Sequence, residues 1–165
     1  MADPLTGCVI SPGQKIDTGF RVKVVRDGAV KEMTFAELLT RPTIVSVYMK
    51  NNTPSCDRQN SSLAPHAEEF DRAGFNLIAL SRDTCGSHRR YAHEKQLGYT
   101  LVSDPEDNFA RAADAMVQKS MYGRTYTGPA RAAFVLDRDG TVLAVAPKVD
   151  TRDHAAQIKE LIKAR

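Results

Sequence analysis

Two near-continuous apolar runs constrain the fold of this chain more than any other feature of its sequence. TIVSVYM covers Thr43 to Met49, and FNLIALS covers Phe75 to Ser81. Apolar runs without polar alternation are typical of strands in a sheet that is covered on both faces. The stretch from Cys56 to Ala73 between them has helical character. A strand–helix–strand order favours parallel pairing of the two strands and an α/β fold class.

The remaining elements fit the same class, with parallel strands at the centre of the sheet and antiparallel strands at an edge. Pro65 should kink the helix at 56–73 or weaken its first half, because proline cannot donate a backbone hydrogen bond. The other expected elements, in order along the chain, are a hairpin at 20–35 around Asp27-Gly28, a short helix after Thr34, a helix from Asp83 or Thr84 to Lys95, a strand at 99–104, a helix at 105–115, an irregular segment at 118–130, a second hairpin at 131–147 and an amphipathic helix at 153–164.

Length and composition limit the class of protein. The chain has 165 residues, of which 42% are hydrophobic and 26% charged, and it shows no repeat or linker. We therefore expect a single domain over 1–165, with a flexible start at 1–14. The net charge of +3 is small and mixed, so nucleic acid is not an expected partner. No apolar run reaches the ~18 residues of a membrane span, and the N-terminus lacks signal-peptide features.

Cys56 stands where the strand at 43–49 gives way to a helix. The N-terminus of a helix offers unpaired N–H groups and partial positive charge, which favour a thiolate. Two interpretations stay open on this basis. Cys56 is a reactive thiol whose neighbour Thr53 donates a hydrogen bond to a bound oxygen, or it is a small buried side chain and Thr53 merely caps the helix.

The other cysteines, Cys8 and Cys85, are not close to Cys56 in sequence. The three cysteines show neither CxxC nor Cys/His zinc spacing, so neither a disulfide framework nor a metal site is expected. Free thiols suit a reducing cytoplasm, which is the expected localisation.

Four motifs together resemble one protein family. They are T-x-x-C at Thr53 and Cys56, S-x-D-x-x-x-S-H from Ser81 to His88, L-x-S-D from Leu101 to Asp104, and Y-G-R-x-Y-x-G-x-x-R from Tyr122 to Arg131. The combination resembles the peroxiredoxins, and most of all the bacterioferritin-comigratory or Q-type group, over roughly residues 15 to 165. The resemblance implies a thioredoxin-like fold and a peroxidase that reduces hydrogen peroxide and organic hydroperoxides without metal, haem or flavin. It also implies thioredoxin or a similar dithiol protein as the reductant, and a monomer.

The resemblance assigns the catalytic roles. Cys56 matches the peroxidatic cysteine, Thr53 the threonine that contacts the peroxide, and Arg131 an arginine at the start of a late strand. A guanidinium is always charged and offers several donors, so it suits a thiolate and the charge that develops on the peroxide oxygens. Gln59 matches a supporting position. The product, a sulfenic acid on Cys56, has to be reduced before it over-oxidises.

The sequence departs from the family pattern at three positions. Met49 replaces a proline that has no backbone N–H, and we expect a perturbed pocket there. Ser61 and Ala92 stand where many members of the group carry the resolving cysteine, so either the mechanism differs or the chain is an engineered variant. Cys85 is a possible resolving residue, which would require the Cys56 helix to unwind. Reduction of Cys56 by an external thiol is the alternative.

A second function is compatible with these departures, namely a peroxide sensor or binding module with weakened turnover.

Several other residues also receive an interpretation. His88 should order a loop rather than act as a base, His66, His93 and His154 should lie on the surface, Asp83 and Asp104 should cap helices, and Tyr122 and Tyr126 either line the pocket mouth or pack elsewhere.

Overall fold

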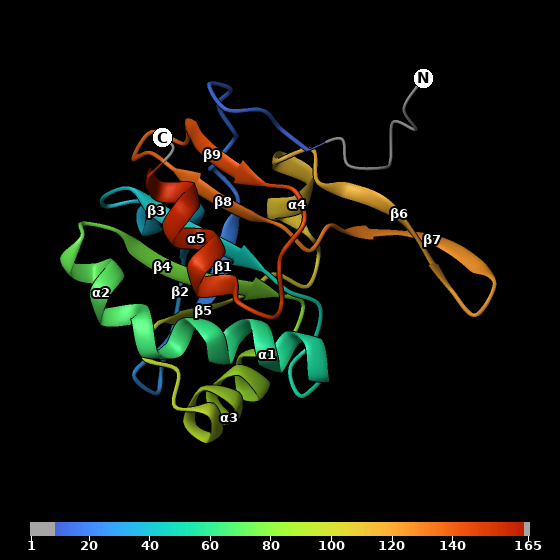
Figure 1. The fold of residues 1–165 in the computed structure, drawn as a ribbon, viewed down its shortest axis with the longest axis horizontal. Helices are drawn as coiled ribbons and strands as arrows, with labels where there is room; N and C mark the ends of the chain where they lie inside the picture. The colour runs from blue at the N-terminus through green and yellow to red at the C-terminus, as the bar shows by residue number, and fades with distance from the viewer. Residues whose placement is uncertain (1–8, 164–165) are drawn as a thin grey trace.

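The centre of the structure, a computed structural model that describes residues 9–163, is a seven-stranded mixed sheet. The strands lie in the order β2-β1-β5-β4-β3-β8-β9, and β3, β4 and β5 pair in parallel (Figure 1). The antiparallel pairs β1–β2 and β8–β9 form the two edges, as predicted. The strand bounds are β1 Arg21–Arg26, β2 Ala29–Thr34, β3 Thr43–Val47, β4 Asn76–Ser81, β5 Thr100–Ser103, β8 Ala133–Leu136 and β9 Val142–Ala146.

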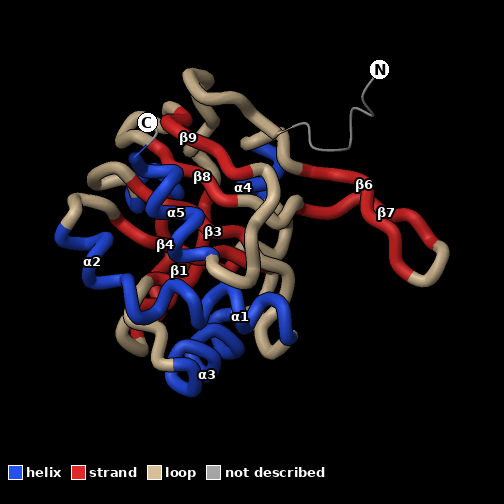
Figure 2. The backbone as a smooth tube through the Cα atoms, in the orientation of Figure 1, coloured by secondary structure: helices blue, strands red, loops and turns tan. Residues whose placement is uncertain are grey.

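Helices cover both faces of this sheet, which explains the apolar runs. The helices α1 (Pro54–Leu63), α2 (Ala67–Arg72), α3 (Cys85–Lys95) and α5 (His154–Lys163) pack on the face that carries Ile44 and Tyr48 of the β3 segment (Figure 2). The 3₁₀ turn η1 (Phe35–Leu38) and α4 (Asn108–Ala112) pack on the opposite face with Val45 and Val47. Successive residues of β3 therefore enter two different cores, and all of them are buried.

The breaks between the helices follow the local sequence. The 3₁₀ turn η2 (Ala64–His66) holds Pro65 and separates α1 from α2, which confirms the predicted kink. Thr84 caps α3 by accepting a hydrogen bond from the Ser87 N–H at 3.2 Å. Asp104 accepts from the N–H groups of Asn108 and Phe109 at 3.0 and 2.9 Å, so it caps α4 as predicted. The helix itself is shorter than the predicted 105–115.

The segment predicted to be irregular, 118–130, is instead most of a hairpin. Strands β6 (Met116–Met121) and β7 (Arg124–Pro129) form a separate two-stranded sheet that projects from the body (Figures 1 and 2). Tyr122 and Gly123 connect them with φ values of 53° and 76°, the backbone pattern of a tight hairpin turn. The prediction was wrong because both strands are largely exposed, so they lack the apolar alternation that marks a half-buried strand.

The start of the chain was expected to be flexible over 1–14, and residues 1–8 of this range, with Cys8, lie outside the described residues. Within the described part, Ile10 is buried and its N–H donates to the Ala113 carbonyl at 2.9 Å. Between residues 9 and 163, no helix combines the length and the apolar character needed to cross a membrane.

Candidate active site

Cys56 lies in the first turn of α1, directly after the loop that follows β3. Thr53 occupies the N-cap position and Pro54 the first helical position, where a missing N–H is tolerated. The Cys56 side chain is only 1% exposed, and its Sγ accepts a hydrogen bond from the Met49 N–H at 3.4 Å. A proline at position 49 would have no backbone N–H and could not make this hydrogen bond.

A cavity of about 350 Å³ opens at Cys56. Four segments that are far apart in sequence build it, namely the loop before α1 with the first turn of that helix, the loop after β4, the β6–β7 hairpin and the connection from β7 to β8. Tyr126 lines this cavity, whereas Tyr122 lies at the hairpin tip and is 97% exposed. The lining residues are Met49, Thr53, Pro54, Ser55, Cys56, Arg82, Lys119, Met121, Tyr126, Pro129 and Arg131.

Thr53 faces the cavity with a hydrogen-bonding role opposite to the expected one. Its hydroxyl donates to the Lys50 carbonyl at 2.8 Å, and its side chain makes no cap hydrogen bond to the helix. A carbonyl oxygen can only accept, so the single hydroxyl proton is committed to Lys50. Thr53 Oγ1 is therefore left as an acceptor toward the cavity, rather than as the donor inferred from the sequence.

Gln59 contacts the guanidinium of Arg131 from outside the cavity lining. The Arg131 NH1 group donates to Gln59 Oε1 at 3.1 Å, and the Gln59 side chain is fully buried. Arg131 lies just before β8 rather than within a strand. Among the described residues, Gln59 is the side chain to which Arg131 donates, so the other N–H groups of the guanidinium remain for the cavity. This geometry agrees with a supporting role for Gln59.

Two further cationic side chains, Arg82 and Lys119, line the cavity, and neither was identified as a site residue from the sequence. Arg82 forms an ion pair with Asp107. Lys119 comes from β6, and its Nζ lies 2.7 Å from Met49 Sδ. Burial lowers the pKa of Lys119, and the nearby Arg131 lowers it further. Lys119 was missed because the hairpin that carries it has no Asn-Gly or Asp-Gly turn and no apolar alternation in its strands.

His88 orders the loop before α1, as predicted. It is fully buried, and burial lowers its pKa. Its Nε2 lies 3.1 Å from the Val102 carbonyl and its Nδ1 lies 3.2 Å from Asn51 Nδ2. Asp83 binds the same loop rather than capping a helix, because its Oδ2 accepts from the Asn51 N–H at 3.0 Å. The cap prediction was therefore wrong for Asp83.

The histidines predicted to lie on the surface divide into two groups. His93 is exposed and His66 is partly exposed beside Glu69, but His154 is fully buried. His154 is the first residue of α5, and its Nε2 lies 2.9 Å from Ser46 Oγ in β3. The surface prediction for His154 was wrong because it relied on polar sequence neighbours, whereas the hydrogen-bond partner lies on the distant strand β3. Ser46, a hydroxyl inside an otherwise apolar run, was the available signal.

Cys85 lies in a different hollow, of about 350 Å³, beside Ser103 of β5 and Lys23 of β1. The two cavities share no lining residue, and both cysteines are free thiols. In this conformation the two thiols are therefore not joined, and each lies in its own hollow. Ser61 is exposed and Ala92 is partly buried.

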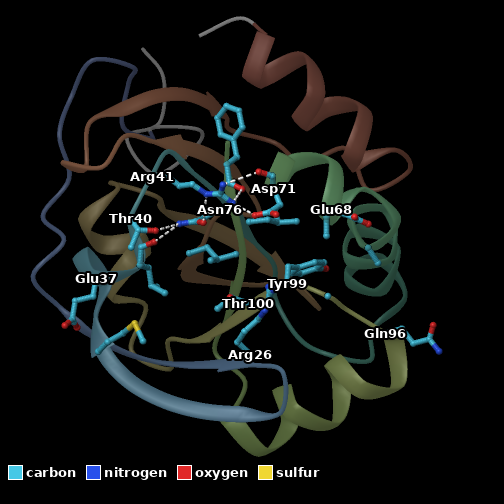
Figure 3. A pocket seen from close by; sticks show the side chains of 18 residues that line it. Arg26, Glu37, Thr40, Arg41, Glu68, Asp71, Asn76, Gln96, Tyr99 and Thr100 are labelled. Atoms are coloured by element: carbon cyan, nitrogen blue, oxygen red, sulfur yellow. Dashed lines mark hydrogen bonds and ion pairs between the residues drawn. The ribbon is translucent and has the colours of Figure 1, made fainter. Parts of the chain in front are cut away.

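A larger pocket, of about 650 Å³, lies at the opposite end of the parallel strands. Figure 3 shows the side chains that line it. Asn76 and Thr100, at the amino ends of β4 and β5, line it. Arg41 in this pocket is already bonded to Asp71 and Asn76. The pocket contains no cysteine, so its size does not make it the reactive site. Within residues 9–163, no cluster of potential ligands could hold a metal ion.

Comparisons with known proteins identify the family to which the chain belongs. Residues 12–145 match the AhpC/TSA family. Peroxiredoxin Bcp of Xanthomonas campestris is 31% identical over 121 residues, which cover 73% of this chain and 76% of that protein. Peroxiredoxin Bcp of Escherichia coli is 27% identical over 75% of this chain and 80% of its own length.

A solved structure of Xanthomonas campestris peroxiredoxin Q superposes with a TM-score of 0.82 at 25% identity, covering 93% of this chain and 98% of that one. The fold is therefore the thioredoxin-like fold of the peroxiredoxins, as expected. The chain belongs to the AhpC/TSA family and is a homologue of the Bcp and Q-type peroxiredoxins.

Proposed function

We propose that this peroxidase uses Cys56 as its nucleophile against hydrogen peroxide and organic hydroperoxides. The observation that carries the proposal is the cavity that joins the buried Cys56 sulfur to Arg131 and the acceptor oxygen of Thr53. A related solved structure, the bacterioferritin comigratory protein of Xanthomonas campestris at 25% identity, was studied for alkyl peroxide reduction.

In the first step, the Cys56 thiolate attacks the terminal, proton-bearing oxygen of ROOH. A sulfur–oxygen bond forms, the O–O bond breaks, and RO⁻ leaves and takes a proton from solvent. Cys56 becomes a sulfenic acid. The Thr53 oxygen can accept the O–H of the attacked oxygen, and the Arg131 donors can stabilise charge on both oxygens. Lys119 adds positive charge to the same cavity.

In the second step, an external thiol attacks the sulfenic sulfur, releases water and leaves a mixed disulfide on Cys56. A second thiol of the same reductant then displaces Cys56 as a thiolate. Thioredoxin or a similar dithiol protein is the proposed reductant. The separation of the two hollows favours this one-cysteine cycle over resolution by Cys85, which would require α1 to unwind.

We also propose that the protein is a monomer and that it acts in the cytoplasm. Cys56 and Cys85 are both free thiols, which suits a reducing compartment. In residues 9–163 the exposed large apolar side chains are Val30, Met121, Tyr122 and Tyr126. These few side chains do not form the broad apolar surface that is typical of a permanent subunit interface, which supports a monomer. Size-exclusion chromatography with light scattering tests the monomer.

Peroxide consumption in the presence of thioredoxin, thioredoxin reductase and NADPH tests the function. We expect repeated turnover by the wild-type protein and none by Cys56→Ser. Full activity of Cys56→Ser would refute the assignment. A single oxidation without turnover would point to the sensor function instead. After one equivalent of peroxide, mass spectrometry should find sulfenic acid at Cys56 with Cys85 still free, and a Cys56–Cys85 disulfide would contradict the one-cysteine cycle.

A further inference from the structure

A buried line of side chains runs from the start of α5 to the guanidinium of Arg131. His154, Ser46 and Gln59 are each 0% exposed, and they come from α5, β3 and α1 respectively. Buried polar groups are costly unless they are hydrogen bonded, and every member of this line has partners. The donors and acceptors along it can be assigned one by one.

The assignment starts at Gln157, whose Nε2 donates to the Lys148 carbonyl at 2.8 Å. Because a carbonyl only accepts, this contact fixes which end of the Gln157 amide is nitrogen. The Gln157 Oε1 atom accepts from the Asp150 N–H at 2.9 Å and lies 3.0 Å from His154 Nδ1. His154 Nδ1 therefore carries a hydrogen.

The other ring nitrogen of His154 is then an acceptor. Burial lowers the pKa of His154, which favours the neutral ring with one N–H. With that hydrogen on Nδ1, the Ser46 hydroxyl donates to Nε2 across 2.9 Å. The Ser46 oxygen in turn accepts from Gln59 Nε2 at 2.8 Å.

The final link fixes Gln59. Its Nε2 also donates to the Val47 carbonyl at 3.1 Å, so both amide hydrogens point away from the cavity. The Gln59 Oε1 atom is thereby directed at Arg131 NH1 at 3.1 Å. A flip of the amide would present N–H groups to the guanidinium and an oxygen to the Val47 carbonyl, and both contacts would be repulsive.

We propose that Ser46 and His154 are positioning residues for the peroxidase reaction, which lock the Gln59 amide in the orientation that holds Arg131 in the cavity at Cys56. This inference rests on the proposed function. Neither residue touches the cavity, and both act through Gln59. Ser46→Ala removes the hydroxyl that accepts from Gln59 Nε2, and His154→Met removes the ring nitrogen that accepts from Ser46. In both variants the Gln59 amide can adopt other orientations, and Arg131 loses its fixed hydrogen-bond acceptor.

The test measures the second-order rate constant for oxidation of Cys56 by hydrogen peroxide, in competition with a haem peroxidase. Loss of one hydrogen bond behind Arg131 should slow Ser46→Ala and His154→Met by about tenfold. His154→Gln keeps an acceptor at the position of Nε2 and should stay within about threefold of the wild type. In an Arg131→Met background, Ser46→Ala should cause no further loss.

Tyr99→Phe is the matched control. The Tyr99 hydroxyl, from the residue just before β5, donates to Asn60 on α1, the residue next to Gln59, and Tyr99 does not line the cavity at Cys56. The control loses a buried hydrogen bond to the same helix and should keep the wild-type rate. Equal rates for Ser46→Ala, His154→Met and Tyr99→Phe would overturn the proposal, as would the same loss with and without Arg131.

A measurement on the wild-type protein avoids any dependence on how the variants fold. Nitrogen-15 NMR of the histidine rings should find His154 neutral with its hydrogen on Nδ1 at pH 7. A hydrogen on Nε2 would make His154 the donor to Ser46, which reverses the assigned hydrogen-bond direction and refutes the proposal. A wild-type protein that does not react with peroxide, with a correct His154 tautomer, would instead refute the proposed function and the positioning role with it.

Discussion

Cys56 and Cys85 occupy matching places in the fold and have different surroundings. Each lies in the first turn of a helix that follows one of two neighbouring parallel strands, with a threonine at the N-cap. Cys56 is buried beside the Met49 N–H, Arg131 and Lys119. Cys85 lies in its own hollow, where burial raises the pKa of its thiol and Lys23 only partly opposes this effect.

The difference shows that a helix N-terminus does not by itself make a reactive thiol. The groups that distinguish Cys56 come from other segments, including a loop, a projecting hairpin and the connection before β8. Four measurements test this difference between the two cysteines.

Removal of each thiol should have very unequal effects. Cys56→Ser should reduce peroxide turnover by at least about a thousandfold, because the nucleophile is lost. Cys85→Ser should keep turnover within about twofold, because an external thiol resolves the sulfenic acid. Steady-state assays with thioredoxin measure both variants. A large loss in Cys85→Ser would identify it as the resolving residue.

The contribution of the distant arginine should come next. Arg131→Met should slow oxidation of Cys56 by about a hundredfold, as for the loss of one preorganised charged donor. Arg131→Lys should recover only part of this rate, because an ammonium lacks the planar fork that binds Gln59. Competition kinetics with hydrogen peroxide provide the measurement. Equal rates for Arg131→Lys and the wild type would show that charge alone is sufficient.

Alkylation of Cys85 should depend on pH in a predictable direction. The thiolate is the reactive form, and burial raises the pKa of Cys85, so its labelling should lag behind that of an unfolded peptide at pH 8. Below its pKa, the labelling rate should rise about tenfold per pH unit. Lys23→Met should slow labelling further, since the nearby positive charge lowers this pKa. Peptide mass spectrometry after iodoacetamide treatment separates the cysteines, and faster labelling in Lys23→Met would contradict the assignment.

The N–H of Met49 should have the smallest effect of the four. Met49→Pro removes the donor to Cys56 Sγ and should slow alkylation of Cys56 at pH 6 by roughly fivefold, from a loss of about 1 kcal/mol. Met49→Leu keeps the N–H but loses the contact with Lys119, so it is the matched control. Identical rates for the two variants would show that the side chain, and not the N–H, matters.

The fold class followed from the sequence because β3 and β4 are buried on both faces and leave an unmistakable apolar pattern. The motifs identified Cys56, Thr53 and Arg131, which the structure brings to one cavity. The hairpin at 116–129 could not be predicted in this way, since it buries little. The contact between Ser46 and His154 spans 108 residues, and no local pattern encodes it.

The hydrogen bond from Thr53 to the Lys50 carbonyl has a consequence for which peroxides suit the cavity. With its own proton committed, the Thr53 oxygen is satisfied only by a molecule that brings a hydrogen of its own. Hydroperoxides carry one on the terminal oxygen, and dialkyl peroxides do not. If Cys56 is oxidised in this cavity as proposed, an intramolecular contact in a surface loop would discriminate between two classes of oxidant before any bond is broken.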